Sequence, residues 1–217
     1  MFKIELHAHT SEVSSCSRLP ARVLVDNCVA AGYHAVVVTD HFADYFVDSQ
    51  GAMSWEEIVA RFMAGYRAAR DYGKLPVLLG MEYRNFETYN DYLVYGVTEE
   101  FLLAHPTLCH MPFAQFFTLC DKAGFLVYQA HPFRRDMSRM DPAFLHGAEV
   151  YNGNIRHNSN NDQAAAFADE HGLLRISGSD LHIPSDAVHC GILTEVEIRD
   201  NAALLSVLRS KKYALLP

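Results

Sequence analysis

Residues 3–13 read KIELHAHTSEV and place two histidines, His7 and His9, on either side of one alanine. Successive side chains of a β-strand point to opposite faces, so residues two apart project from the same face and their tips can converge. Two imidazoles arranged in this way can bind one metal ion. An isolated His-x-His pair is more often part of an ordinary polar strand face, so the rest of the chain has to decide between the two interpretations.

The composition is typical of a globular protein. The chain has 217 residues, of which 50% are hydrophobic and 20% charged, and this predicts one domain spanning residues 1–217. The longest apolar runs, AVVV and VLLG, are far too short for a membrane span, and the amino terminus lacks the charged-then-apolar layout of a secretory signal. We therefore expect a cytoplasmic protein with no membrane partner, and the sequence leaves its oligomeric state open.

The charge balance argues against binding of long nucleic acid, and the cysteines argue against two kinds of cysteine-based structure. The formal net charge of −8 has the wrong sign for a protein that binds long nucleic acid by neutralising phosphates. The five cysteines are odd in number, widely spaced and form no C-x-x-C pair, which argues against a disulfide framework and a thiolate zinc site. The histidines, by contrast, number 12, which is high for this length.

Short apolar runs alternate with longer helical patterns along the chain, and this alternation predicts an α/β protein with a parallel sheet or barrel. Helices are expected at residues 20–32, 54–73, 112–123, 159–171 and 201–210, with Ser54 and Glu57 as a capping box and Asp200 as a cap. Residues 98–112 are expected to form a loop over one rim. The predicted strands are residues 3–7, 35–39, 76–82, 92–97, 125–130, 148–151, 173–178 and 191–198.

Metal-ligating side chains follow the carboxyl ends of five of these strands. In an α/β barrel the carboxyl ends of the strands converge on one rim, which carries the active site. A single histidine or aspartate there is usually structural, but so many nitrogen and oxygen ligands from separate strands favour a metal centre without thiolates. Glu82 is the candidate bridge between two ions, because its two oxygens can be shared. The residues concerned are Asp40, His41, Glu82, His131, Asn152, Asp180 and His182.

The segments HAHT, VVVTDH, GMEYR, QAHPFR, EVYNG and GSDLH, in this order and spacing, resemble the motifs of the polymerase and histidinol phosphatase (PHP) superfamily of metal-dependent phosphoesterases. The resemblance spans about residues 5 to 182. It implies a distorted (β/α)7 TIM-like barrel with two or three divalent ions, commonly zinc, manganese or iron, at the C-terminal rim of the strands.

The resemblance also implies a distribution of the ligands. His7, His9, Glu82 and Asp180 would hold one ion, Glu82 and His131 a second, and His41 and His182 a third. Many members of the superfamily carry a histidine or aspartate shortly after the first motif, where this chain offers Glu12 as the nearest carboxylate. A further ligand of the second ion is expected between Glu82 and His131, where His110 is preferred over His105.

Clustered divalent ions activate a bound water and hold a phosphoryl oxygen, which is the chemistry of phosphate ester hydrolysis. Asp40, Asp180 and His182 are the candidate catalytic residues, although Asp40 could instead orient a ligand histidine. Guanidinium groups match phosphate geometry, so one or two of four arginines near the strand ends are expected to bind substrate together with Asn152. These arginines are Arg84, Arg134, Arg135 and Arg156.

Two other functions compete with this prediction. Amidohydrolase barrels also open with His-x-His, but they usually bridge two metals with a carboxylated lysine, and no lysine of this chain falls at a carboxyl strand end. A non-catalytic, metal-stabilised PHP module would be expected to have lost ligands. Among phosphoesterase substrates, histidinol phosphate, another small monoester, a cyclic diester and the end of a short oligonucleotide all remain open.

Overall fold

The first strand pairs on both sides and thereby sets the order of the sheet. In the computed structural model, which describes residues 1–217, β1 (Phe2–Glu5) runs parallel to β2 (Ala35–Val38) and antiparallel to β9 (Gly191–Thr194). The ten-stranded sheet has the order β10-β9-β1-β2-β4-β5-β6-β7-β8, and β3 pairs with β4 off this path. The remaining strands are β3 (His41–Ala43), β4 (Val77–Arg84), β5 (Tyr92–Tyr95), β6 (Leu126–Gln129), β7 (Gly147–Asn152), β8 (Leu174–Gly178) and β10 (Ala214–Leu216).

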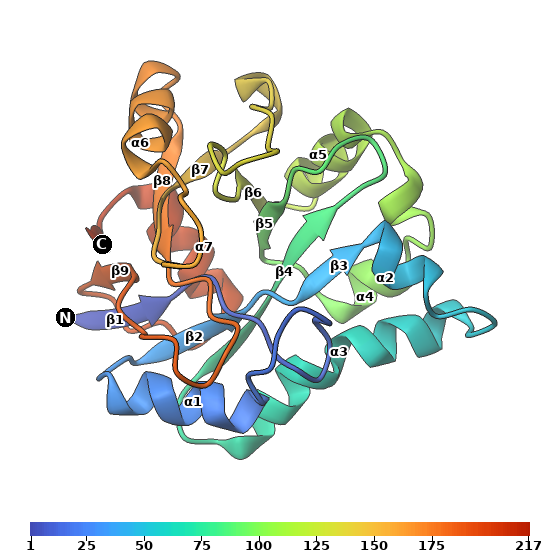
Figure 1. The fold of residues 1–217 in the computed structure, drawn as a ribbon, viewed down its shortest axis with the longest axis horizontal. Helices are drawn as coiled ribbons and strands as arrows, with labels where there is room; N and C mark the ends of the chain where they lie inside the picture. Colours follow the sequence, from blue (N-terminus) through green and yellow to red (C-terminus); the bar gives the residue numbers. More distant parts are fainter.

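The sheet curls until its last parallel strand meets its first. Beyond β8, Leu181 pairs with Ala8 in an isolated parallel bridge. His9 N donates to Leu181 O at 3.0 Å, and Leu181 N donates to His7 O at 3.3 Å. The result is a nearly closed barrel (Figure 1), and the predicted distorted TIM-like barrel is confirmed. The distortion has a clear source, because β5 runs antiparallel to both of its neighbours.

The predicted helices pack on the outside of the barrel, except for α7, which lies at one of its ends. α1 (Ala21–Ala30) and α3 (Trp55–Tyr72) lie side by side below the strands in Figure 1. Ser54 and Glu57 form the predicted capping box of α3, and Asp200 caps α7. The other α-helices are α2 (Asp44–Asp48), α4 (Glu99–Leu103), α5 (Phe113–Lys122), α6 (Asn161–Glu170) and α7 (Asn201–Ser210).

Two predicted segments differ from the structure, and four short elements were not predicted. Residues 98–112 are not a plain loop, because α4, capped by the Thr98 side chain, and a 3-10 turn at Leu108–His110 lie within them. The strand expected at 191–198 ends at Thr194. β3, α2, β10 and a second 3-10 turn at Pro142–Phe144 are too short to leave a periodic pattern.

The barrel strands are apolar on both faces because both faces are covered. Val37 of β2 points into the barrel with residues of β1, β4, β5, β6 and α7. Val36 and Val38, on the other face of β2, pack with α1. α7 covers the end of the barrel where β6 begins, since Arg209 donates to Gly124 O just before that strand. The opposite rim of the barrel is not covered by α7 and is therefore the one available for a functional site. No helix combines the length and the apolar character needed to cross a bilayer.

Candidate metal centre

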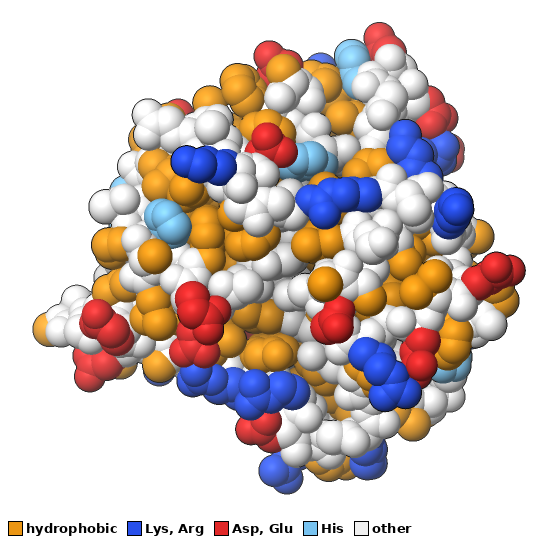
Figure 2. All heavy atoms as spheres, turned by 180° about the vertical axis from the view of Figure 1, so that it is seen from behind, with side chains coloured by type: hydrophobic (Ala, Val, Ile, Leu, Met, Phe, Trp, Pro, Cys, Tyr) orange, Lys and Arg blue, Asp and Glu red, His pale blue; other side chains and the backbone are white.

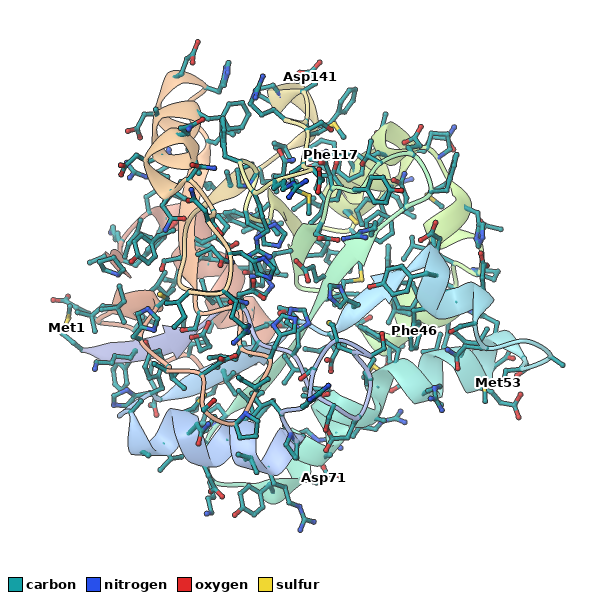
Figure 3. The ribbon with its side chains drawn as sticks, in the orientation of Figure 1. Met1, Phe46, Met53, Asp71, Phe117 and Asp141 are labelled. Atoms are coloured by element: carbon teal, nitrogen blue, oxygen red, sulfur yellow. The ribbon has the colours of Figure 1, made fainter.

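Two histidines follow β1 into the middle of the open rim. His7 and His9 are both fully buried, and their Nε2 atoms lie 3.1 Å apart. The end of β8 passes so close that a Cβ at Gly178 would lie 2.4 Å from the Cβ of His7, so only glycine fits there. Figure 3 shows side-chain nitrogens gathered in this region between the strands.

The carboxylate of Glu82, near the end of β4, lies among four imidazoles. Each of its two oxygens faces a different pair of rings, which is the arrangement that a bridging ligand requires. Oε1 lies 3.4 Å from His7 Nε2 and 3.2 Å from His131 Nε2, and Oε2 lies 3.2 Å from both His9 Nε2 and His41 Nδ1.

Three overlapping groups of ligand atoms result, and within each group the atoms lie within 4.8 Å of one another. Glu82 belongs to two groups and so does His9, as expected where neighbouring ions share ligands. The groups are His7, His9 and Glu82; Glu82, Asp91 and His131; and His9, His41 and His182.

Asp180 lies against these groups from the side of β8. Its Oδ1 atom is 3.5 Å from His7 Nε2, 3.6 Å from His9 Nε2 and 3.2 Å from His182 Nδ1. Asp180 and His131 both have positive φ angles, 54° and 29°. Non-glycine residues adopt this conformation at a cost of about 1–3 kcal/mol, and such strain is concentrated at functional sites.

The electrostatics of the centre are dominated by its carboxylates. Burial favours the neutral form of Glu82, but the imidazole of His7 and the contact with His131 outweigh it and hold the Glu82 pKa well below its usual range. Burial also favours neutral His7, yet Glu149, Asp180 and Glu82 hold the His7 pKa well above normal. A divalent cation would neutralise the same negative field that here favours protons on imidazole.

The residues present fit such ions. Burial lowers the pKa of His41 to about 3, so its imidazole is neutral and keeps a lone pair for a metal. His41 Nδ1, the ring nitrogen on the side of Glu82, is buried and has no hydrogen-bond partner. Buried polar atoms without partners are rare, and an ion is one explanation for them.

Sequence reasoning missed two carboxylates. Asp91 is grouped with Glu82 and His131, and it also accepts from Arg84 at 2.7 and 2.8 Å. It was missed because it precedes antiparallel β5, whose amino end lies at the carboxyl rim. The sequence did contain a signal for Asp91, because a further ligand was expected between Glu82 and His131 and Asp91 lies in that interval.

Glu149, inside β7, is the second omission. Its Oε1 lies 2.8 Å from His7 Nδ1, and its Oε2 accepts from the backbone N of His131 at 3.0 Å and from Asn152 Nδ2 at 2.9 Å. A carboxylate on Nδ1 leaves Nε2 of His7 free for a metal and fixes the ring. The segment EVYNG begins with this residue, so a signal was present.

Three predicted site residues do not join the groups. Glu12 instead accepts from the backbone N of Ala21 at 3.0 and 3.1 Å, where it caps α1. His110 is half-exposed and pairs with Asp48 at 3.2 Å. Asp40 is buried, but its carboxylate accepts from Thr10 N, Thr10 Oγ1 and Ser14 Oγ at 2.6–2.7 Å. Asp40 therefore holds the loop after His9 in place, and Ser14 Oγ, which donates to Asp40, also lies 3.3 Å from His9 Nδ1. This agrees with the alternative that Asp40 orients a ligand histidine.

The four candidate arginines have different surroundings. Arg134 reaches the centre, where its NH2 donates to Asp180 Oδ2 at 2.7 Å and to Asn152 Oδ1 at 2.9 Å. Arg84 pairs with Asp91 beside the centre. Arg156 is bound by Asp186, and the Arg135 side chain is 93% exposed, so neither joins the cluster.

Comparison with known proteins gives fold relatives only. No family model matches the sequence, and no curated protein matches it either. Three structural similarities stand out among solved structures. A two-domain protein from Bacteroides vulgatus, described as containing a predicted PHP-like metal-dependent phosphoesterase, has a TM-score of 0.72 at 17% identity, over 99% of this chain and 64% of that one.

Endonuclease Q from Pyrococcus furiosus, a lesion-specific endonuclease, has a TM-score of 0.66 at 12% identity, over 99% of this chain and 57% of that one. An amidohydrolase from Chromobacterium violaceum has a TM-score of 0.58 at 19% identity, over 95% and 96% of the two chains. This chain thus spans less than two thirds of the first two proteins.

Proposed function

We propose that this chain, which has the fold of PHP-like metal-dependent phosphoesterases, hydrolyses phosphate esters with the help of two or three divalent ions, for which zinc, manganese and iron are the candidates. The observation that carries the proposal is the set of three ligand groups that overlap at Glu82 and His9. Overlapping groups suit adjacent ions, and adjacent ions suit the in-line displacement of a phosphate ester.

The ligand groups suggest which residues hold which ion. His7, His9, Glu82 and Asp180 would bind the central ion, Glu82, Asp91 and His131 a second, and His41 and His182 a third with His9 nearby. Bound ions would lower the pKa of a coordinated water and neutralise charge on the phosphoryl group. Glu149 keeps Nε2 of His7 directed at the central position through its contact with Nδ1.

Arg134 is the proposed anion-binding residue of the chain. Its guanidinium is largely buried, and its Nε has no partner, so it retains a donor for a phosphoryl oxygen. Asn152 positions it by accepting from NH2 at 2.9 Å. Asp40 acts as a positioning residue through Ser14, whose Oγ accepts from the backbone N of His41 at 3.0 Å.

The preferred substrate is a small ester, with short oligonucleotides as the upper limit. The net charge of −8 gives little long-range attraction to a polyanion. On the face shown in Figure 2, lysine and arginine side chains stand in separate groups among acidic and uncharged ones. A structure of endonuclease Q holds a 27-mer duplex, so nucleic acid is the alternative to test.

The test compares wild type with Glu82→Gln after metal removal and reloading with Mn²⁺, Zn²⁺ or Fe²⁺. Elemental analysis should give about two or three equivalents in the wild type, and hydrolysis of p-nitrophenyl phosphate or its diester should appear with the metal. Glu82→Gln keeps the shape but loses the charge, so it should lose metal and rate together. The matched control is Glu56→Gln, at an exposed position of α3. Full metal and rate in Glu82→Gln would refute the bridge.

An amidohydrolase is the second candidate, because one fold relative carries that description. A carboxylated lysine would be the usual bridge, but Lys74 is exposed and pairs with Asp26. The other four lysines lie in the first half of β1, in α5 and directly after α7, and none follows the carboxyl end of a parallel barrel strand. Amide and lactone substrates in the same metal-loaded assay distinguish the candidates, since only an amidohydrolase would hydrolyse them faster than the phosphate esters. A non-catalytic module would bind metal and hydrolyse neither.

A further inference from the structure

A cavity of about 420 Å³ borders the metal centre between α2 and the β4–β5 connection. This size is within the range of small-molecule sites. Two of its lining residues contact candidate ligands. The ring of Tyr45 lies 6.2 Å from that of His41, and Arg84 donates to Asp91 at 2.7 and 2.8 Å. The cavity is therefore adjacent to the candidate ligands His41 and Asp91.

The cavity also gathers the exposed aromatic side chains of the protein. The chain has 13 phenylalanines, 11 tyrosines and one tryptophan. Only Tyr45, Phe86 and Tyr89 among them are largely exposed, at 42%, 55% and 73%, and all three line this cavity. Aromatic rings scattered at random would not be exposed only beside one site, so the cluster indicates a ligand surface.

The loop that carries two of these rings is held by hydrogen bonds of its own. Asn85 Oδ1 accepts from the backbone N of Glu87 at 3.3 Å, and Glu87 Oε2 accepts from the backbone N of Phe113 at 2.7 Å. Polar side chains thus anchor the loop to α5, whereas Phe86 and Tyr89 remain in solvent. The exposure of the two rings comes from an ordered loop and not from a missing anchor.

We infer that this cavity binds a planar aromatic ring on the alcohol side of the ester. The inference rests on the proposed function and narrows its substrate class to esters of aromatic-bearing alcohols, such as nucleoside phosphates, imidazolyl alkyl phosphates or aryl phosphates. Phe86 and Tyr89 supply apolar faces for stacking. The Arg84 guanidinium, 5.8 Å from the centroid of Tyr45, supplies a polar group at the edge.

The test uses the double variant Phe86→Ala with Tyr89→Ala, because both side chains are exposed and their loss leaves no buried cavity. The substrates are adenosine 5′-monophosphate, histidinol phosphate and phenyl phosphate, against glycerol 3-phosphate and glucose 6-phosphate. Stacking on an aromatic side chain is lost on truncation, so the ratio of kcat/KM for aromatic over aliphatic esters should fall at least tenfold, on the order of what one stacked base contributes. The three aromatic substrates identify which ring is preferred.

Calorimetric binding of the methylphosphonate analogue of adenosine 5′-monophosphate, which has no ester bond to hydrolyse, to metal-loaded protein gives a second readout that does not depend on turnover. The double variant should bind at least about tenfold more weakly with unchanged metal content, and Val196→Ala, an exposed apolar residue elsewhere, should bind as the wild type does. Hydrolysis without preference for aromatic esters, together with unchanged binding in the double variant, would overturn the inference and leave the proposed function standing. No hydrolysis of any ester would instead count against the proposed function, and the binding comparison would still decide the inference.

Discussion

Replacing Glu149 by glutamine tests a residue that orients the proposed metal ligand His7 but is not itself a proposed ligand. Glu149 is fully buried and faces His7 Nδ1, the backbone N of His131 and Asn152 Nδ2 within 2.8–3.0 Å. Its two oxygens can accept from all of these donors. Glutamine has nearly the same shape, but one of its two terminal atoms is a donor, so at least one buried donor must lose its acceptor.

The expected magnitude follows from that count. A buried donor without a partner costs about 1–3 kcal/mol, and each 1.4 kcal/mol is about a tenfold change in an equilibrium constant. Removing the partner of a metal-binding histidine typically weakens metal affinity about 10–100-fold. We therefore expect Glu149→Gln to fold, with a reduced free energy of unfolding, and to bind Mn²⁺ or Zn²⁺ at least tenfold more weakly.

Competition with a chromophoric chelator measures this affinity, and circular dichroism checks the fold. The matched control is Glu170→Gln at the exposed end of α6, which should change neither quantity. If Glu149→Gln kept its metal affinity within twofold of the wild type while folding normally, the contact between Glu149 and His7 would have no role in metal binding, and the reasoning would be wrong.

Three further predictions follow from the same structure. Arg134→Ala should raise KM for a small phosphate ester about tenfold by removing a charge-assisted hydrogen bond. The Arg135 side chain faces solvent, so Arg135→Ala should leave KM within about twofold of the wild-type value. Equal changes in KM would contradict the assignment of Arg134 as the anion-binding residue. Gly178→Ala should lower the free energy of unfolding by at least about 1–3 kcal/mol, because the new Cβ would lie 2.4 Å from that of His7, and an unchanged Tm would show that the chain can move aside. Binding of a 30-mer single strand at near-physiological salt should be weak, and nanomolar, strongly salt-dependent binding would favour a nuclease.

Much of the fold could be predicted from the sequence because its signals are local. The alternation of apolar runs and helical patterns indicated the barrel, and Ser54, Glu57 and Asp200 marked helix starts that the structure contains. The direction in which a strand runs relative to its neighbours is not determined by its own residues. Nothing in the segment YLVY shows that β5 runs antiparallel to β4, since an apolar strand reads the same in either direction.

In the candidate site too, some residues could be predicted from the sequence and others depended on strand direction or on tertiary contacts. The rule that strand ends meet on one rim brought His41, Glu82 and His131 together in the prediction, and the structure also brings them together. It failed for Asp91, which precedes a reversed strand. Glu12 was chosen for its nearness in sequence, but a carboxylate just ahead of a helix has a closer partner in the free backbone N–H groups of that helix.

The seam of the barrel has a consequence for folding. The isolated pairing of Ala8 with Leu181 joins two segments that are almost the whole chain apart, and bringing such distant segments together is costly in chain entropy. The same two segments carry His7, His9, Asp180 and His182. An ion bound by these four residues would link the first and last parallel strands and keep them in register. Loss of metal should therefore separate this seam before other parts of the barrel. In metal-free protein, the amide hydrogens of His9 and Leu181 should exchange faster than those in the middle of β4.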